Sequence, residues 1–178
     1  RGLRHRLADG RREARRVLAS DPNKASHERA RKKGIEITDM ETLMREADVV
    51  VATTGVPGLI KPEMVREGQV ILALTNPHPE IEPENAIEAG AAFAADGTSV
   101  NNVLGYPGIF RGALLAGAGE INLAMKLAAA EAIADLAGED DLVPDVLEPN
   151  VHERVSNAVR NAAIKSGVAH LDRAPMGL

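Results

Sequence analysis

The stretch Asp48-Val49-Val50-Val51-Ala52-Thr53 decides the predicted fold. Its apolar residues run without interruption, most are β-branched, and the turn residues Thr54-Gly55 follow at once. A short unbroken apolar run that stops at a turn is typical of a strand buried on both faces, as in a parallel sheet. The sequence therefore predicts a buried parallel strand here.

The same pattern returns at residues 70–74 and 91–95, and a shorter strand is expected at residues 35–37. Pro62 and Pro83 stand between these strands, each where a helix can begin. Strand–helix–strand units with short links predict a parallel sheet with right-handed crossovers.

Helices are expected on both sides of this region. Two precede it, over residues 11–19 and 21–33, the second with Asp21 as N-cap and Pro22 at its first position. Three follow it, over about residues 108–117, 120–137 and 151–167. The predicted fold class is α/β: a partial doubly wound, Rossmann-type parallel sheet followed by C-terminal helices.

Composition excludes several classes of site and location. The 178 residues contain no cysteine, so disulfides, thiolate catalysis and cysteine-rich zinc sites are excluded. Aromatic residues make up 2%, too few for a stacking platform that binds single-stranded nucleic acid. No apolar stretch approaches the roughly 20 residues of a membrane span, and no signal-peptide core is visible. We expect a cytoplasmic protein without a membrane partner.

Charge is distributed unevenly along the chain. Residues 1–33 hold 12 Lys/Arg and 4 Asp/Glu, whereas the remaining residues carry a net charge of −13. A basic front end is typical of either a solvated helix surface or a phosphate- or nucleic-acid-binding face. No base-reading motif accompanies it, so no nucleic-acid partner is expected.

Small polar residues follow each of the three predicted buried strands. They are Thr53-Thr54-Gly55, then Thr75-Asn76-Pro77, then Asp96-Gly97-Thr98-Ser99 with Asn101-Asn102 close behind. Carboxyl ends of parallel strands meet at one edge of a sheet, where ligands bind. Asparagine both donates and accepts hydrogen bonds without carrying charge. The sequence therefore predicts a small-molecule site at this edge.

Each segment also has a purely structural interpretation. The threonines could cap a strand end, Asn76-Pro77 could form a turn, and Asn101-Asn102 could cap the next helix. Glu80, Glu82 and Glu84 look like a solvated helix start. The histidines have no metal-ligand spacing, His78 is expected to be a loop residue, and no Ser-His-Asp pattern is evident.

Taken together, these motifs resemble the C-terminal part of bacterial malic enzymes. The resemblance rests on the segments 47–51, 62–65, 73–81, 101–114, 121–122, 125–126, 128–134 and 166–169, among which Asn101 to Leu114 is the most specific. It implies that residues 1–118 are the second half of a Rossmann-type NAD(P)-binding domain. Residues 119–178 would be a helical extension packed on that half.

The resemblance also implies an activity and roles for individual residues. Malic enzymes oxidatively decarboxylate malate to pyruvate with NAD or NADP and a Mg or Mn ion. Asn76 and Asn102 would bind substrate. Residues expected at the cofactor are Thr53, Thr54, Gly55, Asn76 and Asn101.

The glycine fingerprint, the catalytic residues and the metal-binding carboxylates of the family belong to segments upstream of the matching part. No catalytic residue or metal ligand is therefore expected in residues 1–178, and the chain alone should be inactive. The expected partners are those upstream segments of the same enzyme and further copies in a homo-oligomer. Two alternatives stay open: a non-catalytic association module, and another Rossmann-type enzyme of the adenosylhomocysteinase or amino-acid dehydrogenase kind.

Overall fold

The computed structural model describes residues 16–100, 102–138, 143–145, 148 and 150–170. They form two compact units, which divide after residue 100. In the first unit the elements are β1 (Leu18–Ala19), α2 (Lys24–Lys32), β2 (Glu36–Ile37), α3 (Met40–Glu46), β3 (Val49–Ala52), η1 (Pro62–Met64), β4 (Val70–Ala73), α4 (Pro83–Glu88) and β5 (Phe93–Asp96). In the second they are η2 (Asn102–Leu104), α5 (Tyr106–Leu115), α6 (Leu123–Ala134) and α7 (Val151–Lys165).

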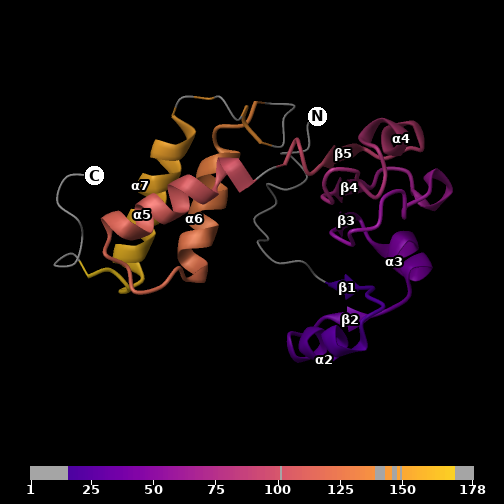
Figure 1. Ribbon diagram of the computed structural model, residues 1–178, viewed down its shortest axis with the longest axis horizontal. Helices are drawn as coiled ribbons and strands as arrows, with labels where there is room; N and C mark the ends of the chain where they lie inside the picture. The colour runs from indigo at the N-terminus through magenta and orange to yellow at the C-terminus, as the bar shows by residue number, and fades with distance from the viewer. Residues whose placement is uncertain (1–15, 101, 139–142, 146–147, 149, 171–178) are drawn as a thin grey trace. The chain divides into compact units, whose positions relative to one another are not determined.

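Parallel strands form the centre of the first unit (Figure 1). The strands β3, β4 and β5 pair in that order, all parallel, with Ala52 beside Ala73 and Ala73 beside Asp96. A second, two-stranded parallel sheet joins β1 to β2. The predicted α/β class and parallel sheet are confirmed.

The core of this unit is aliphatic, as the low aromatic content requires. Ile71 and Ala73 of β4 are buried beneath Met44 of α3 and Ile60. Gln69 is fully buried just before β4 and fastens the amino end of the sheet. Its side chain donates to the carbonyls of Met44 and Ala47 at 2.7 and 2.8 Å and accepts from the amide of Arg66 at 2.7 Å.

The helix predicted over residues 11–19 is wrong in its last part, and residues 11–15 lie outside the described part of the chain. Leu18–Ala19 form β1, because the amides of Glu36 and Thr38 donate to the carbonyls of Val17 and Ala19 at 3.0 Å. Pairing with a distant strand has overridden local helix propensity.

The start of α2 also differs from the prediction. Asn23, two residues after Asp21, is the N-cap, and its side chain accepts from the amide of Ala25. Asp21 instead lies two residues after β1. Asp21 therefore follows the carboxyl end of a strand, where its Oδ1 atom accepts from the amide of Asn23 at 2.7 Å.

The regular elements among the described residues of the second unit are all helices, and the three predicted helices are confirmed with shifted ends (Figure 1). Gly108 and Gly112 let α5 approach α7 closely. A Cβ atom at Gly112 would lie 2.5 Å from the carbonyl oxygen of Ser156 and 2.8 Å from Cβ of Val159. Within this unit α5 packs with α6 and α7. The predicted domain boundary at residue 118 stays a prediction.

Candidate functional site

The carboxyl ends of β3, β4 and β5 stop level with one another because the register pairs Ala52, Ala73 and Asp96. The segments that follow them are joined by side-chain hydrogen bonds. The hydroxyl of Thr75 accepts from the amide of Gly55 at 3.0 Å, so the loop after β3 touches the loop after β4. The predicted clustering of these loops is confirmed, although what they bind stays a prediction.

Glu80 lies beneath these two loops and is fully buried. Its Oε1 atom accepts from the Thr54 amide at 2.6 Å, the Thr54 hydroxyl at 2.8 Å and the Thr75 hydroxyl at 2.6 Å. Its Oε2 atom accepts from the Thr75 amide at 3.3 Å. The prediction that Glu80 belongs to a solvated helix start is therefore wrong.

These hydrogen bonds keep Glu80 ionised. Burial alone raises the pKa of this carboxyl, but the donors on Thr75 and Thr54 outweigh burial and hold the pKa below its ordinary value. The chain bends back to place Glu80 there, since the amides of Gly58 and Ile60 donate to the carbonyls of Pro79 and Glu80.

Asn76 joins the loop after β4 to the loop after β5. Its Nδ2 atom donates to the carbonyl of Gly97 at 3.2 Å, and the Asn76–Pro77 peptide bond is cis. Gly97 is buried, and a Cβ atom there would lie 2.7 Å from both Asn76 Nδ2 and the carbonyl oxygen of Leu74. Only glycine permits this close approach, which leaves the exposed Asn76 side chain at the edge of the sheet.

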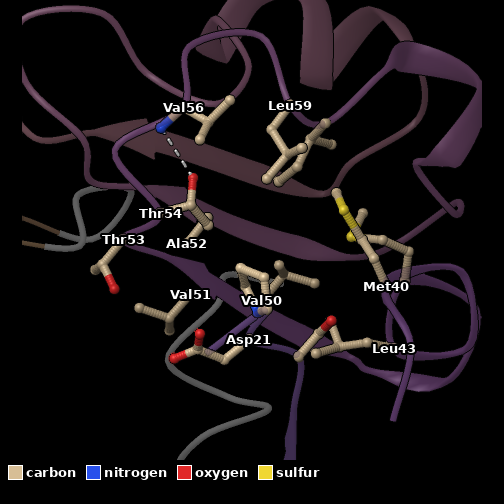
Figure 2. Close-up of a pocket in the computed structure, with 14 residues that line it drawn as sticks. Asp21, Met40, Leu43, Val50, Val51, Ala52, Thr53, Thr54, Val56 and Leu59 are labelled. Carbon is tan, nitrogen blue, oxygen red and sulfur yellow. Dashed lines mark hydrogen bonds between the residues drawn. The ribbon is translucent and has the colours of Figure 1, made fainter. Parts of the chain in front are cut away.

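A pocket of about 470 Å³ opens beside the carboxyl end of β3. Figure 2 shows Thr53, Thr54 and Asp21 along it, with Met40 and Leu43 of α3 and Leu59 supplying apolar walls. The volume is within the range of small-molecule sites, and an apolar pocket with a few polar groups is their usual character. Thr53, Thr54 and Asp21 can thus contact one ligand.

Asp21 is the residue of this pocket that the sequence analysis missed as a site residue. The Asp-Pro pair is typical of a helix start, which concealed its position after β1. The available signal was the segment Val17-Leu18-Ala19 before it, since an acidic residue after an apolar run is typical of ribose recognition in doubly wound domains.

The two paired asparagines belong to the second unit or lie at its boundary. Asn102 is exposed and begins η2. Asn101 lies outside the described residues, so its predicted cofactor contact has no structural account. Before them, Asp96 accepts from the amides and hydroxyls of Thr98 and Ser99; burial raises its pKa, but these donors lower it overall.

Within the described part of the chain, no three His, Asp or Glu side chains gather as metal ligands. These residues therefore do not fit a Mg or Mn site. Among the described helices, none has both the length and the apolarity needed to cross a membrane.

Comparisons with known proteins agree with this geometry. No protein-family model matches the chain. NAD-dependent malic enzyme 1 of Bacillus subtilis is 56% identical over 83% of this chain and 34% of its own length. An NADP-dependent malic enzyme of Halomonas elongata is 41% identical over 74% of this chain and 38% of its own length.

Solved structures match as well. A malic enzyme from Pyrococcus horikoshii has a TM-score of 0.68 and 41% identity, covering 75% of this chain and 34% of that one. The chain thus spans about a third of the length of the relatives it matches. With the loop cluster, the pocket and these identities in agreement, the chain belongs to the malic enzyme family.

Proposed function

We propose that the complete protein oxidatively decarboxylates malate to pyruvate and CO2 with reduction of NAD, and that this chain supplies part of the dinucleotide and substrate site. The observation that carries the proposal is the cluster of Thr54, Gly55, Thr75 and Asn76 at the carboxyl edge of the sheet, beside the pocket that holds Asp21. Dinucleotides bind at this edge in doubly wound folds.

The proposal assigns roles to residues that follow the three strands. Thr53, Thr54 and Gly55 lie along the dinucleotide, and Asn76 lies near the nicotinamide and the substrate. Asn101 contacts the cofactor and Asn102 the malate. Hydride would pass from C2 of malate to the dinucleotide while the C2 hydroxyl gives up its proton, and the oxaloacetate so formed would lose CO2. A Mg or Mn ion held by other segments would polarise the carbonyl.

Asp21 favours NAD over NADP. A carboxylate after the strand can accept a hydrogen bond from the 2′-hydroxyl of the adenosine ribose. The same charge repels the 2′-phosphate of NADP. The matching relatives include both NAD- and NADP-dependent enzymes and so support neither dinucleotide over the other. The proposed preference for NAD therefore rests on Asp21.

An additional parallel strand would complete the sheet. The doubly wound order places the first strand between the second and the fourth. In the described part of the chain, β1 and β3 are edge strands with a hollow between them. About 530 Å³ of space lies there, lined by residues 16–18 and 46–51. Val49 and Val51 are 51% and 59% exposed on this side of the sheet. A strand from an upstream segment of the same enzyme would fill this space and bring the glycine-rich turn to the Asp21 pocket.

Titration calorimetry of the complete protein tests the cofactor proposal. NAD should bind at least tenfold more tightly than NADP, and Asp21→Asn should remove most of that difference. Equal affinities in the wild-type protein would contradict the assigned role of Asp21. The homo-oligomer and the cytoplasmic location stay predictions.

A further inference from the structure

Glu80 is a carboxylate buried among neutral hydrogen-bond donors. Its exposed fraction is 0%. Among the described residues, none of the ion pairs involves it. A buried charge is costly unless hydrogen bonds replace its hydration. Here the amides and hydroxyls of Thr54 and Thr75 do so.

The direction of these hydrogen bonds is fixed by the charge. An ionised carboxylate can only accept, so both threonine hydroxyls must donate to Oε1. Because the Thr75 hydroxyl hydrogen points at Glu80, the lone pairs of the hydroxyl oxygen are left to accept from the amide of Gly55, whose nitrogen lies 3.0 Å from that oxygen. The orientation of Gly55 is thereby coupled to Glu80, although the two residues share no hydrogen bond.

We propose that Glu80 is a positioning residue that sets the conformation of the loops after β3 and β4, and through them the affinity of the site for the dinucleotide. The proposal rests on the proposed function for the identity of the ligand. It assigns Glu80 no contact with substrate or cofactor. What Glu80 supplies is one acceptor atom shared by both loops.

Gln69 offers a matched control, because it lies at the amino end of β4 whereas Glu80 lies beneath the loops at the carboxyl end. Like Glu80 it is polar, has an exposed fraction of 0% and forms several hydrogen bonds. It contacts Met44, Ala47 and Arg66, all away from the carboxyl edge. Gln69→Leu should therefore lower stability without altering the loops.

Hydrogen exchange and kinetics of the complete protein test the proposal together. Glu80→Gln keeps the side-chain shape but turns one acceptor oxygen into a donor. Exchange at the Gly55 amide should become at least tenfold faster, and KM for NAD should rise at least tenfold with a smaller change in kcat. Gln69→Leu should leave both quantities within about twofold, at a temperature where both variants are folded.

Unchanged exchange at Gly55 in Glu80→Gln, or equal changes in both variants, would overturn the proposal. Hydrogen exchange at the Gly55 amide does not require turnover, so this measurement tests the role of Glu80 even if the complete protein fails to oxidise malate. If Glu80→Gln does not fold, Thr54→Val and Thr75→Val replace it. Because both threonines donate to one atom, the loss of kcat/KM in the double variant should be smaller than the product of the losses in the two single variants. A loss equal to that product would count against the shared acceptor.

Discussion

The amide nitrogen of Thr54 lies 2.6 Å from Oε1 of Glu80, which is 26 residues further along the chain. This hydrogen bond joins the end of β3 to the segment that follows β4. A fixed carboxyl edge reduces the ordering that a ligand must impose when it binds. The relationship between these two residues therefore connects the stability of the sheet with the affinity of the proposed site.

Acid should weaken this connection. Hydrogen bonds hold the pKa of Glu80 below its ordinary value of 4.5 in the folded protein. At a pH between the pKa of Glu80 in the folded protein and its pKa in the unfolded chain, the unfolded chain binds more protons. The ionised Glu80 carboxylate therefore contributes its full share of folding stability above about pH 4.5. That share is lost as the pH falls through the pKa of the folded protein. Thermal unfolding of wild-type protein and Glu80→Gln should differ most near neutral pH and converge in acid. A difference that grows on acidification would contradict the ionised state of Glu80.

Gly97→Ala should impair catalysis and also lower stability, because its Cβ atom would meet the Leu74 carbonyl oxygen at 2.7 Å. The new Cβ atom would lie 2.7 Å from Asn76 Nδ2, so the asparagine must move. We expect kcat/KM of the complete protein for malate to fall at least tenfold. Gly119→Ala is the control, because its nearest neighbour is 3.8 Å away on His170. Equal activity of both variants would refute the role of Asn76.

Gly112→Ala should destabilise the helical unit. Its Cβ atom would lie 2.5 Å from the Ser156 carbonyl oxygen, and overpacking of this kind costs roughly 1–3 kcal/mol, which exceeds the helix-propensity gain of about 1 kcal/mol from alanine. Gly105→Ala, with nearest atoms at 3.6 Å, should change stability much less. Chemical denaturation measures both variants, and equal midpoints would show that α5 and α7 do not pack this closely.

The local pattern of residues was enough to predict β3, β4 and the helices that begin at Pro62 and Pro83. Buried β-branched runs and proline at a helix start depend on nearby residues alone. By contrast, β1 is a strand only because β2 lies beside it, and no local property of Leu18–Ala19 indicates this.

Glu80 and Asp21 were misjudged for a similar reason. Each is close to a proline in a segment typical of a helix start, and each acquires its place from a segment distant in sequence. Glu80 is buried because Thr54 lies over it. Asp21 lies in the pocket because the segment after β1 lines it together with the end of β3. Contacts of this range are set by the topology of the sheet and not by local spacing.

Asp21→Ser should change the choice of cofactor. Loss of a hydrogen bond to a charged group costs roughly 1.5–3 kcal/mol, so kcat/KM with NAD should fall about tenfold or more, while kcat/KM with NADP rises. Asp48→Asn is the control, since Asp48 is exposed at the amino end of β3 and pairs with Arg66. Steady-state kinetics with both dinucleotides checks this. A parallel loss with NAD and NADP would exclude a role for Asp21 at the ribose.

The proposed malic enzyme activity is tested most directly by the product balance of the complete protein supplied with malate, NAD and Mg. We expect NADH and pyruvate to form in equal amounts, with NAD used in preference to NADP. The isolated 178-residue chain should form neither product. No malate-dependent NADH from the complete protein, or sustained turnover by the isolated chain, would contradict these expectations.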